Sequence, residues 1–268
     1  MKQVRKHALA FAAMALVTVA MVALSGCVKT TEAAQLSDHV TLPTLQPMLS
    51  QLAAGQPAWR NVNRTALAGR LGWGQVASGN KTGRRIALTF DAGAEGAATP
   101  AVLDALKNAG LHCTFFVTGQ FAKSYPDLVK RMVADGHELG NHSYSHPHFP
   151  TLTEEQVAFE ISKTEAAVRD LCGLSTKPYF RFPYGSGSNA LVEQINALGY
   201  LGVLWTLDTL DSMGASAEAI LSRVNKGAGP GAIVLMHCGL PETAKILPRV
   251  IEDLESQGYQ IVSLTEIF

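Results

Sequence analysis

Three histidines fall within one short stretch, N-H-S-Y-S-H-P-H-F, although the whole chain holds only eight. His142 and His146 are four residues apart, so they share a face on a helical turn and can converge in a tight loop. Imidazole nitrogens are good ligands for Zn²⁺ and similar divalent ions. The H-x-x-x-H spacing alone is a weak motif, so the metal hypothesis depends on its surroundings. His148 follows a proline, and we expect it to be a loop or groove residue.

Reactive side chains, the histidine pair among them, lie at or just after the ends of predicted strands. They are Asp91, His142, His146, Arg181, Asp208, Asp211 and His237. In a parallel β/α fold the carboxyl ends of the strands form one face, and that face carries the site. The alternative is that polar residues simply begin the loops after the strands. That alternative accounts for one or two aspartates, but it accounts poorly for a histidine pair together with a third histidine at another strand end.

From residue 84 onward, short β-rich runs alternate with stretches that have helix signals. Predicted strands cover 86–90, 113–117, 138–140, 179–181, 201–205, 232–236 and 259–262. Predicted helices cover 99–110, 126–136, 153–171, 189–198, 216–225 and 242–256. The alternation predicts an α/β fold with a parallel sheet and crossover helices. About seven such units favour a distorted, closed or nearly closed (β/α) barrel, with a doubly wound open sheet as the alternative.

The first residues have the composition of an export signal. Basic side chains precede an uncharged apolar run, 8–24, and the small residues L-S-G follow up to Cys27. This pattern predicts a signal peptide over 1–26. Its end resembles a bacterial lipobox, which implies that Cys27 is lipidated and that the protein is anchored outside the cytoplasm. An ordinary signal or an amino-terminal membrane helix is the alternative. Mixed composition then indicates a tether or extension over 27–82, with room for one short helix, before a domain at 83–268.

Composition excludes several classes of protein. Hydrophobic residues make up 47% of the 268, enough for a sizeable core. Lys and Arg together number 22, as do Asp and Glu, so no basic field exists to hold nucleic acid.

Beyond Cys27 there remain Cys113, Cys172 and Cys238, an odd number that leaves at least one thiol free if disulfides are internal. Cys113 lies in an apolar run and is expected in the core.

Five short motifs stand in order along the chain: T-F-D-A-G (89–93), H-S-Y-S-H (142–146), R-F-P-Y (181–184), W-T-L-D-T-L-D (205–211) and L-M-H (235–237). Together they resemble the motifs of polysaccharide deacetylases, the NodB-homology enzymes of carbohydrate esterase family 4. The resemblance covers 84–268. It implies a distorted (β/α) barrel of about seven strands. It also implies metal-dependent hydrolysis of an N-acetyl group on an amino sugar, with Zn²⁺ favoured and Co²⁺ or Mn²⁺ as alternatives.

The resemblance also implies roles for the polar residues at the strand ends. Asp91 would be the general base, which takes a proton from the attacking water, and Arg181 would keep it ionised and oriented. His142 and His146 would be metal ligands. His237 would be the general acid that protonates the leaving amine, a role suited to imidazole.

Further positions would support these groups. Asp211, with Asp208 as the second choice, would keep His237 protonated by its opposite charge. The backbone N–H of Tyr184 would stabilise the developing oxyanion. Leu235 and Trp205 would form the apolar wall for the acetyl methyl group, although plain core packing is the alternative for both.

The sequence departs from the family pattern at two positions. The first motif usually has two adjacent aspartates, base and metal ligand, but here the second is Ala92. Catalytic zinc usually has three protein ligands. Another carboxylate, Glu95 being nearest, could replace the missing ligand, water or substrate could fill its place, or the metal site could be lost. In the fourth motif Ser212 stands where the family often has tryptophan, which leaves the shape of the acetyl pocket open.

A lipid-anchored protein outside the membrane faces the cell wall, so acetylated peptidoglycan sugars are the favoured substrate, with other surface glycans or chitin-like polymers behind. Ala92 motivates one rival, a non-catalytic glycan-binding lipoprotein that has lost its metal. A serine hydrolase is disfavoured because F-P-Y-G-S-G-S is not the G-x-S-x-G elbow.

Overall fold

The computed structural model describes residues 57–93 and 95–268. The predicted signal peptide 1–26, Cys27 and the first part of the predicted extension lie outside the described residues. Across the part of the chain that the structure describes, no helix combines the length and apolar character that crossing a bilayer requires.

Within the described residues, a single sheet contains nine strands. In chain order they are β1 (Gln75–Val76), β2 (Arg85–Ala92), β3 (Thr114–Val117), β4 (Glu138–Asn141), β5 (Tyr179–Phe180), β6 (Leu201–Val203), β7 (Leu207–Asp208), β8 (Ala232–His237) and β9 (Gln260–Ile261). Their spatial order is β1-β6-β5-β4-β3-β2-β8-β7, with β9 beside β2. Every pair is parallel.

The sheet curls toward closure because two consecutive strands lie at different places in its order. Only residues 204–206 separate β6, which pairs with β5, from β7, which pairs with β8. The chain therefore leads from one side of the sheet to the other in a few residues. The predicted (β/α) barrel of parallel strands is confirmed, in the form of a curled, incompletely closed sheet, and the doubly wound alternative is not.

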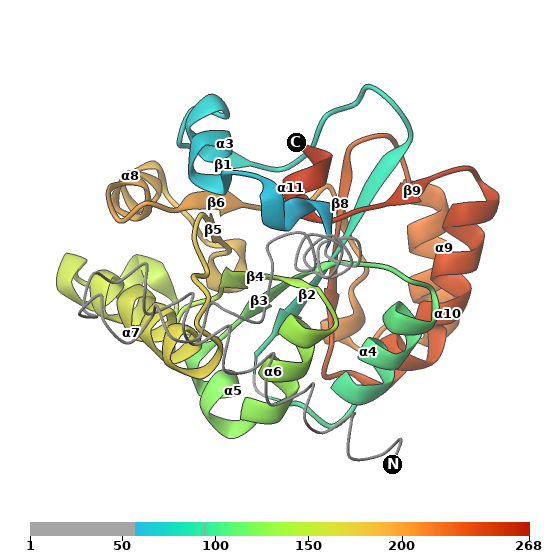
Figure 1. The fold of residues 1–268 in the computed structure, drawn as a ribbon, viewed down its shortest axis with the longest axis horizontal. Helices are drawn as coiled ribbons and strands as arrows, with labels where there is room; N and C mark the ends of the chain where they lie inside the picture. Colours follow the sequence, from blue (N-terminus) through green and yellow to red (C-terminus); the bar gives the residue numbers. More distant parts are fainter. Residues whose placement is uncertain (1–56, 94) are drawn as a thin grey trace, which may run out of the picture. The chain divides into compact units, whose positions relative to one another are not determined.

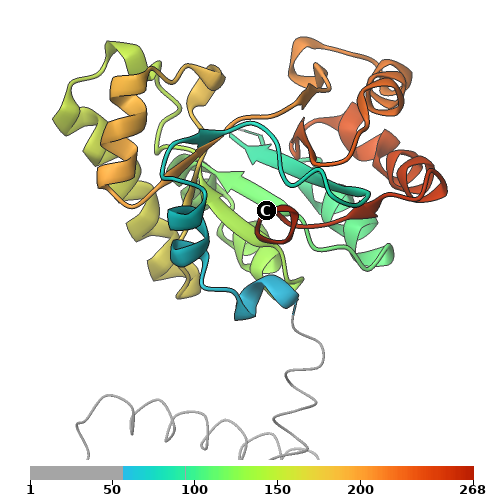
Figure 2. The same ribbon diagram turned by 90° about the horizontal axis from the view of Figure 1, so that it is seen from above.

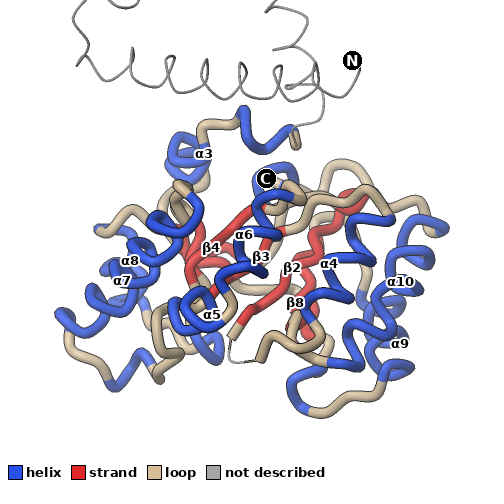
Figure 3. The backbone as a smooth tube through the Cα atoms, turned by 60° about the horizontal axis from the view of Figure 1, so that its bottom comes forward, coloured by secondary structure: helices blue, strands red, loops and turns tan. Residues whose placement is uncertain are grey.

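Helices lie around the strands, as Figure 3 shows. They are α3 (Arg64–Arg70), α4 (Thr99–Asn108), α5 (Gly119–Ser124), α6 (Pro126–Ala134), α7 (Glu154–Cys172), α8 (Asn189–Ala197), α9 (Ala217–Gly227), α10 (Pro241–Ser256) and α11 (Leu264–Ile267). Helices α7 and α8 lie to one side of the sheet, and α9 and α10 to the other (Figure 1). A capping box starts α7: the Gln156 amide donates to Thr153 Oγ1 at 3.3 Å and the Thr153 amide to Gln156 Oε1 at 2.9 Å.

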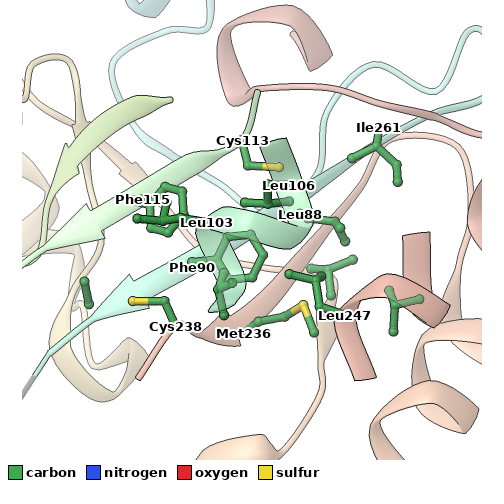
Figure 4. Packing of buried hydrophobic residues seen from close by; sticks show 14 of the residues in the cluster. Leu88, Phe90, Leu103, Leu106, Cys113, Phe115, Met236, Cys238, Leu247 and Ile261 are labelled. Atoms are coloured by element: carbon green, nitrogen blue, oxygen red, sulfur yellow. The ribbon is translucent and has the colours of Figure 1, made fainter. Parts of the chain in front are cut away.

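Alternation along β2 separates the core from the site. Ile86, Leu88 and Phe90 belong to the apolar layer between the sheet and helices α4, α9 and α10. Figure 4 shows Leu88 and Phe90 in this layer. In that layer the rings of Phe90 and Phe115 stack with centroids 5.0 Å apart. Because successive strand residues face opposite ways, the intervening Thr89 and Asp91 lie on the concave face. Burying each large side chain in this layer contributes about 2–3 kcal/mol to folding.

Apolar residues line much of the concave face, and polar groups collect near the carboxyl ends of the strands. The apolar residues are Ala87, Phe116, Tyr179, Leu201, Val203 and Ile233, together with Ala68 of α3 and Leu264 and Ile267 of α11, and Phe116 is in register with Asp91. At the carboxyl ends stand Thr89, Asp91 and Arg181, all buried. The helices thus close the barrel at its amino end, and the polar groups collect at the opposite end.

The compact unit begins earlier than the domain expected at 83–268. It runs from Pro57 to Phe268 and so includes the end of the segment 27–82 that composition indicated as an extension. Trp59 is buried, and its indole N–H donates to the Gly136 carbonyl at 2.9 Å. The 3₁₀ turn Ala58–Asn61 that carries Trp59 packs against α11 (Figure 2).

All three described cysteines are free thiols. Cys113 is buried in the main core cluster, as its apolar surroundings predicted. Burial raises the pKa of the Cys238 thiol to about 12, so Cys238 stays protonated although it follows His237.

Candidate active site

Asp91 and Arg181 form a buried ion pair at the carboxyl ends of β2 and β5. Arg181 Nη1 lies 2.7 Å from Asp91 Oδ1, and neither side chain is more than 6% exposed. Arg181 also donates to Thr89 Oγ1 at 3.0 Å and to the Val203 carbonyl at 3.2 Å. Each guanidinium nitrogen of Arg181 therefore has an acceptor, which is one condition for a buried pair to persist.

These contacts determine the charge of Asp91. Burial by itself would raise the pKa of this carboxyl, but the Arg181 guanidinium, with His142 and His237, holds the pKa below its usual range. Asp91 is therefore ionised at neutral pH. The predicted pairing of Asp91 with Arg181 is present in the structure.

The two histidines of the H-x-x-x-H motif lie together and beside Asp91. The rings of His142 and His146 have centroids 4.8 Å apart, and His142 Nε2 is 3.4 Å from Asp91 Oδ2. His142 Nδ1 is 2.8 Å from the Arg181 carbonyl, which can only accept a hydrogen bond. The proton of neutral His142 thus resides on Nδ1, and the Nε2 lone pair faces the site.

Both imidazoles are neutral near pH 7. Burial lowers the pKa of His142 to about 4, since the nearby Asp91 offsets the loss of solvent only in part. Burial also lowers the pKa of His146. A neutral imidazole with a free lone pair is the form that binds a metal ion.

The described side chains do not offer a complete set of three metal ligands. No group of three His, Cys, Asp or Glu residues among 57–93 and 95–268 is arranged to hold an ion. Glu95 is exposed and does not join the histidines, so it does not replace the missing aspartate in this structure. Ala92 is fully buried in the core layer on the other side of β2 from Asp91. The donor set that fits a divalent ion is therefore the two imidazoles, with the Asp91 carboxylate adjacent.

His237 stands next to Asp91 on the neighbouring strand, with their Cα atoms in register between β2 and β8. Its Nδ1 lies 2.8 Å from Asp211 Oδ1, and its backbone amide donates to Asp211 Oδ2 at 2.7 Å. Thr243 Oγ1 donates to the same Oδ2 at 2.6 Å. Asp211, the first choice from the sequence, is therefore the partner of His237.

The contacts of His237 favour its protonated form, which is the form that the predicted acid role requires. Burial would lower the pKa of His237, but the hydrogen bond that His237 donates to Asp211 and the charges of Asp91 and Asp211 raise it above the ordinary value. The pKa of Asp211 is lowered: burial opposes ionisation, but bonding to His237 and Thr243 outweighs it. Asp208, the second choice, instead accepts a hydrogen bond from the Leu210 amide at 2.8 Å and forms part of a turn.

Tyr184 lies at the rim of the site. Its side chain is 69% exposed, and its ring meets the His146 ring edge-on with centroids 4.6 Å apart. His148 is exposed, as expected of a groove residue, and its ring centroid is 6.2 Å from that of Tyr184. Tyr184 has a left-handed backbone with φ 59°, a conformation that costs a non-glycine residue about 1–3 kcal/mol. Tyr184 thus has this left-handed backbone conformation in the segment that follows β5.

The two apolar residues predicted as a pocket wall occupy different environments. Leu235 is buried on β8, two residues before His237, on the same face of the strand. Trp205 is half-buried, and the Arg181 guanidinium carbon lies 5.7 Å from its ring centroid. Both therefore border the polar cluster, and Trp205 also packs on the core of the concave face.

Two residues of the site had no role in the sequence interpretation. Thr89 orients Arg181 and donates to the Val234 carbonyl at 2.6 Å. Thr243, at the start of α10, is fully buried against Asp211. Thr89 stands two residues before Asp91 on the same strand, and this period-two spacing would have indicated it. Thr243 gives no such signal because its contact crosses between separate elements.

Known proteins resemble this chain in both sequence and structure. The polysaccharide deacetylase family model matches residues 78–203. Peptidoglycan-N-acetylglucosamine deacetylase PgdA of Listeria monocytogenes is 40% identical over 192 residues, which are 70% of this chain and 40% of that protein. The chain thus spans well under half of the length of PgdA. Peptidoglycan-N-acetylmuramic acid deacetylase PdaA of Bacillus subtilis is 37% identical over 192 residues, 70% of this chain and 73% of that protein.

Solved structures agree with the sequence comparison. The structure of Bacillus subtilis PdaA, a family 4 carbohydrate esterase, matches with a TM-score of 0.69 at 34% identity, over 80% of this chain and 92% of that one. A CE4 family pseudoenzyme from Bacillus anthracis matches with a TM-score of 0.69 at 29% identity, over 72% and 68% of the two chains. With a curled parallel barrel, the five ordered motifs and these relatives, the chain belongs to the polysaccharide deacetylase family, carbohydrate esterase family 4.

Proposed function

We propose that this chain is a hydrolase that removes N-acetyl groups from amino sugars of peptidoglycan. The observation that carries the proposal is the placement of an ionised carboxylate, Asp91, in register with a histidine of raised pKa, His237, beside two neutral imidazoles. A base and an acid with opposite protonation states are what amide hydrolysis needs at neutral pH. The names of the relatives PgdA and PdaA support peptidoglycan as the polymer.

The carboxylate would act first. Asp91 takes a proton from a water whose oxygen attacks the acetyl carbonyl carbon, and the carbonyl oxygen becomes negatively charged. Arg181 keeps Asp91 ionised before the step and oriented during it. The backbone N–H of Tyr184 is our candidate donor to the developing oxyanion, since fixed dipoles stabilise such charge without rearrangement.

The imidazolium would act second. His237 donates its proton to the amide nitrogen as the carbon–nitrogen bond breaks, so the products are acetate and a free amine. The Asp211 carboxylate holds His237 protonated until this step. Leu235 and Trp205 supply apolar surface near the polar cluster, which suits the acetyl methyl group.

A divalent ion is the cofactor that we propose for this site, with Zn²⁺ favoured over Co²⁺ or Mn²⁺. When bound, such an ion polarises the acetamide carbonyl and acidifies the attacking water. His142 and His146 would hold it through their unprotonated nitrogens, and Nδ1 of His142 is already fixed by the Arg181 carbonyl. Two protein imidazoles bind an ion more weakly than two imidazoles and an aspartate, so Ala92 predicts an easily removed metal.

A second candidate function is non-catalytic glycan binding. Ala92 and the likeness to a pseudoenzyme from Bacillus anthracis favour it. The intact acid and base pairs favour the enzyme, because glycan binding alone does not need them.

We also propose that the protein works outside the cytoplasm, anchored through a lipid on Cys27. The support is the lipobox-like L-S-G-C after an apolar run, together with the location of the proposed substrate, since peptidoglycan lies outside the cytoplasmic membrane. Mass spectrometry of the purified amino-terminal peptide would test this location independently of the activity.

The experiment for the function compares wild type with His146→Ala. We expect wild type to release acetate from acetylated peptidoglycan fragments or chito-oligomers, and the variant to release none while its circular dichroism spectrum is unchanged. Acetate release by the variant at the wild-type rate would contradict the role of the imidazole pair. Retention of glycan by a wild type that releases no acetate would instead support the binding protein.

A further inference from the structure

The loop that carries both metal-binding candidates is held in an unfavourable backbone conformation. We call residues 142–146 the histidine loop. Ser143 has φ 66° and His146 has φ 60°, in the left-handed region that non-glycine residues rarely adopt. Such conformations persist only where the surroundings determine them. Contacts from other elements must therefore hold the histidine loop.

One set of contacts comes from α5. The carbonyls of Ser143 and Tyr144 accept hydrogen bonds from the amides of Gly119 at 3.1 Å and Gln120 at 3.0 Å. A Cβ on Gly119 would lie 2.1 Å from the Tyr144 ring, so a glycine is needed for this close approach. These bonds fix the carbonyl side of the loop.

A single carboxylate on α7 fixes the amide side. Glu160 Oε2 accepts from the amides of Tyr144 at 2.8 Å and Ser145 at 2.7 Å, and its Oε1 accepts from Ser145 Oγ at 2.8 Å. The Glu160 residue is only 8% exposed. Successive backbone N–H groups that converge on one anion form a nest, and hydrogen bonds to a charged acceptor are stronger than neutral ones.

We propose that Glu160 is the positioning residue of the histidine loop. Its carboxylate takes the place of a bound anion inside the loop and thereby keeps His142 and His146 side by side and facing Asp91. Glu160 touches neither substrate nor any reacting atom in the proposed reaction. The inference concerns the site of the proposed function, and it rests on that function only where acetate release is the readout.

The test is Glu160→Gln, with three readouts. Glutamine keeps one carbonyl acceptor but removes the negative charge on which the two amides converge and turns an N–H₂ toward Ser145 Oγ, so the loop bonds weaken. Hydrogen–deuterium exchange in peptides that cover 142–146 should therefore accelerate about tenfold while exchange in α10 is unchanged. The Kd for Zn²⁺, measured by calorimetry on the apoprotein, should rise about 10–100-fold, and kcat for acetate release should fall by a similar factor with KM within about twofold. A general loss of stability would accelerate exchange in α10 as well, so faster exchange in the histidine loop alone indicates a local positioning role for Glu160.

Two further variants make the result decisive. Asp170→Asn removes an exposed acid from the same helix, and we expect it to behave as wild type in all three readouts. Ser145→Ala removes only the hydroxyl donor and should accelerate exchange in the loop to a smaller extent; it carries the test if Glu160→Gln does not fold. Loop exchange equal to that of Asp170→Asn would overturn the proposal. A wild type that releases no acetate would overturn the proposed function, while loop exchange would still decide the role of Glu160.

Discussion

At the scale of single residues, the site depends on neighbours that hold opposite charges. Asp91 is ionised because Arg181 is buried against it, and the Asp211 carboxylate beside Nδ1 of His237 favours the protonated form of that histidine. Each functional group is thus matched with a partner that is itself saturated with hydrogen bonds. Removing a partner should change the protonation of the functional group while leaving the group in place.

Asp211→Asn should shift the pH dependence of acetate release. Asp211 raises the pKa of His237, and a general acid works only at a pH below its own pKa. Without the charge, the alkaline limb of the kcat/KM profile should move to lower pH, and the rate at pH 8 should fall by about 10²-fold. Asp208→Asn is the matched control, because Asp208 contacts the Leu210 amide and not His237. An alkaline limb that is the same in both variants would refute the pairing.

The residue types were readable from the sequence, and most of their partners were not. Strand ends placed Asp91, Arg181 and His237 on one face, because parallel strands all end there. The choice between Asp208 and Asp211 needed the structure, since the turn that follows β7 decides which of the two carboxylates reaches His237. Glu160 could not be found from the sequence: it lies mid-helix, where glutamates usually face solvent.

At the scale of elements, long periodic segments were predicted within a few residues and several short ones were missed. Helices α4, α6, α7, α8, α9 and α10 all match predicted helices. The missed elements α5, α11, β1 and β7 have two to six residues, too few for a period to show. β7 also continues a predicted strand after a break, and only its pairing with β8 distinguishes it.

Trp59→Ala should destabilise the protein although residue 59 lies in a segment that composition indicated as a tether. The side chain is buried, bonds to the Gly136 carbonyl and lies beneath the guanidinium groups of Arg60 and Arg64. We expect the free energy of unfolding, measured in urea, to fall by about 3–5 kcal/mol. The exposed Val62→Ala should change it by less than about 0.5 kcal/mol. A loss below about 1 kcal/mol for Trp59→Ala would show that this segment is dispensable for folding.

At the scale of the whole molecule, buried neutral histidines make stability depend on pH. His137 accepts a hydrogen bond from the Cys113 amide at 3.2 Å, and burial lowers the pKa of His137 to about 4. In the unfolded chain the imidazole takes up a proton near pH 6.5, so between these values the unfolded state binds more protons. The free energy of unfolding should therefore fall as pH drops from 6.5 toward 4.

His137→Gln is the variant that tests this origin of acid sensitivity. It should reduce the slope of the unfolding free energy against pH between 6.5 and 4, measured in urea after EDTA treatment, and His142 and His146 account for the slope that remains. Asp91 and Asp211, which are each buried in an ion pair, have lowered pKa values. The stability that their ionised forms contribute is therefore lost only at more acidic pH. Equal slopes for the variant and wild type would place the acid sensitivity elsewhere.

The central claim is that two imidazoles beside an ionised carboxylate serve metal-assisted amide hydrolysis, and metal removal tests it most directly. Purified protein should contain up to about one divalent ion per chain, lose both ion and acetate release in EDTA, and recover activity when Zn²⁺, Co²⁺ or Mn²⁺ is returned. Undiminished acetate release by protein shown to be metal-free would contradict the account.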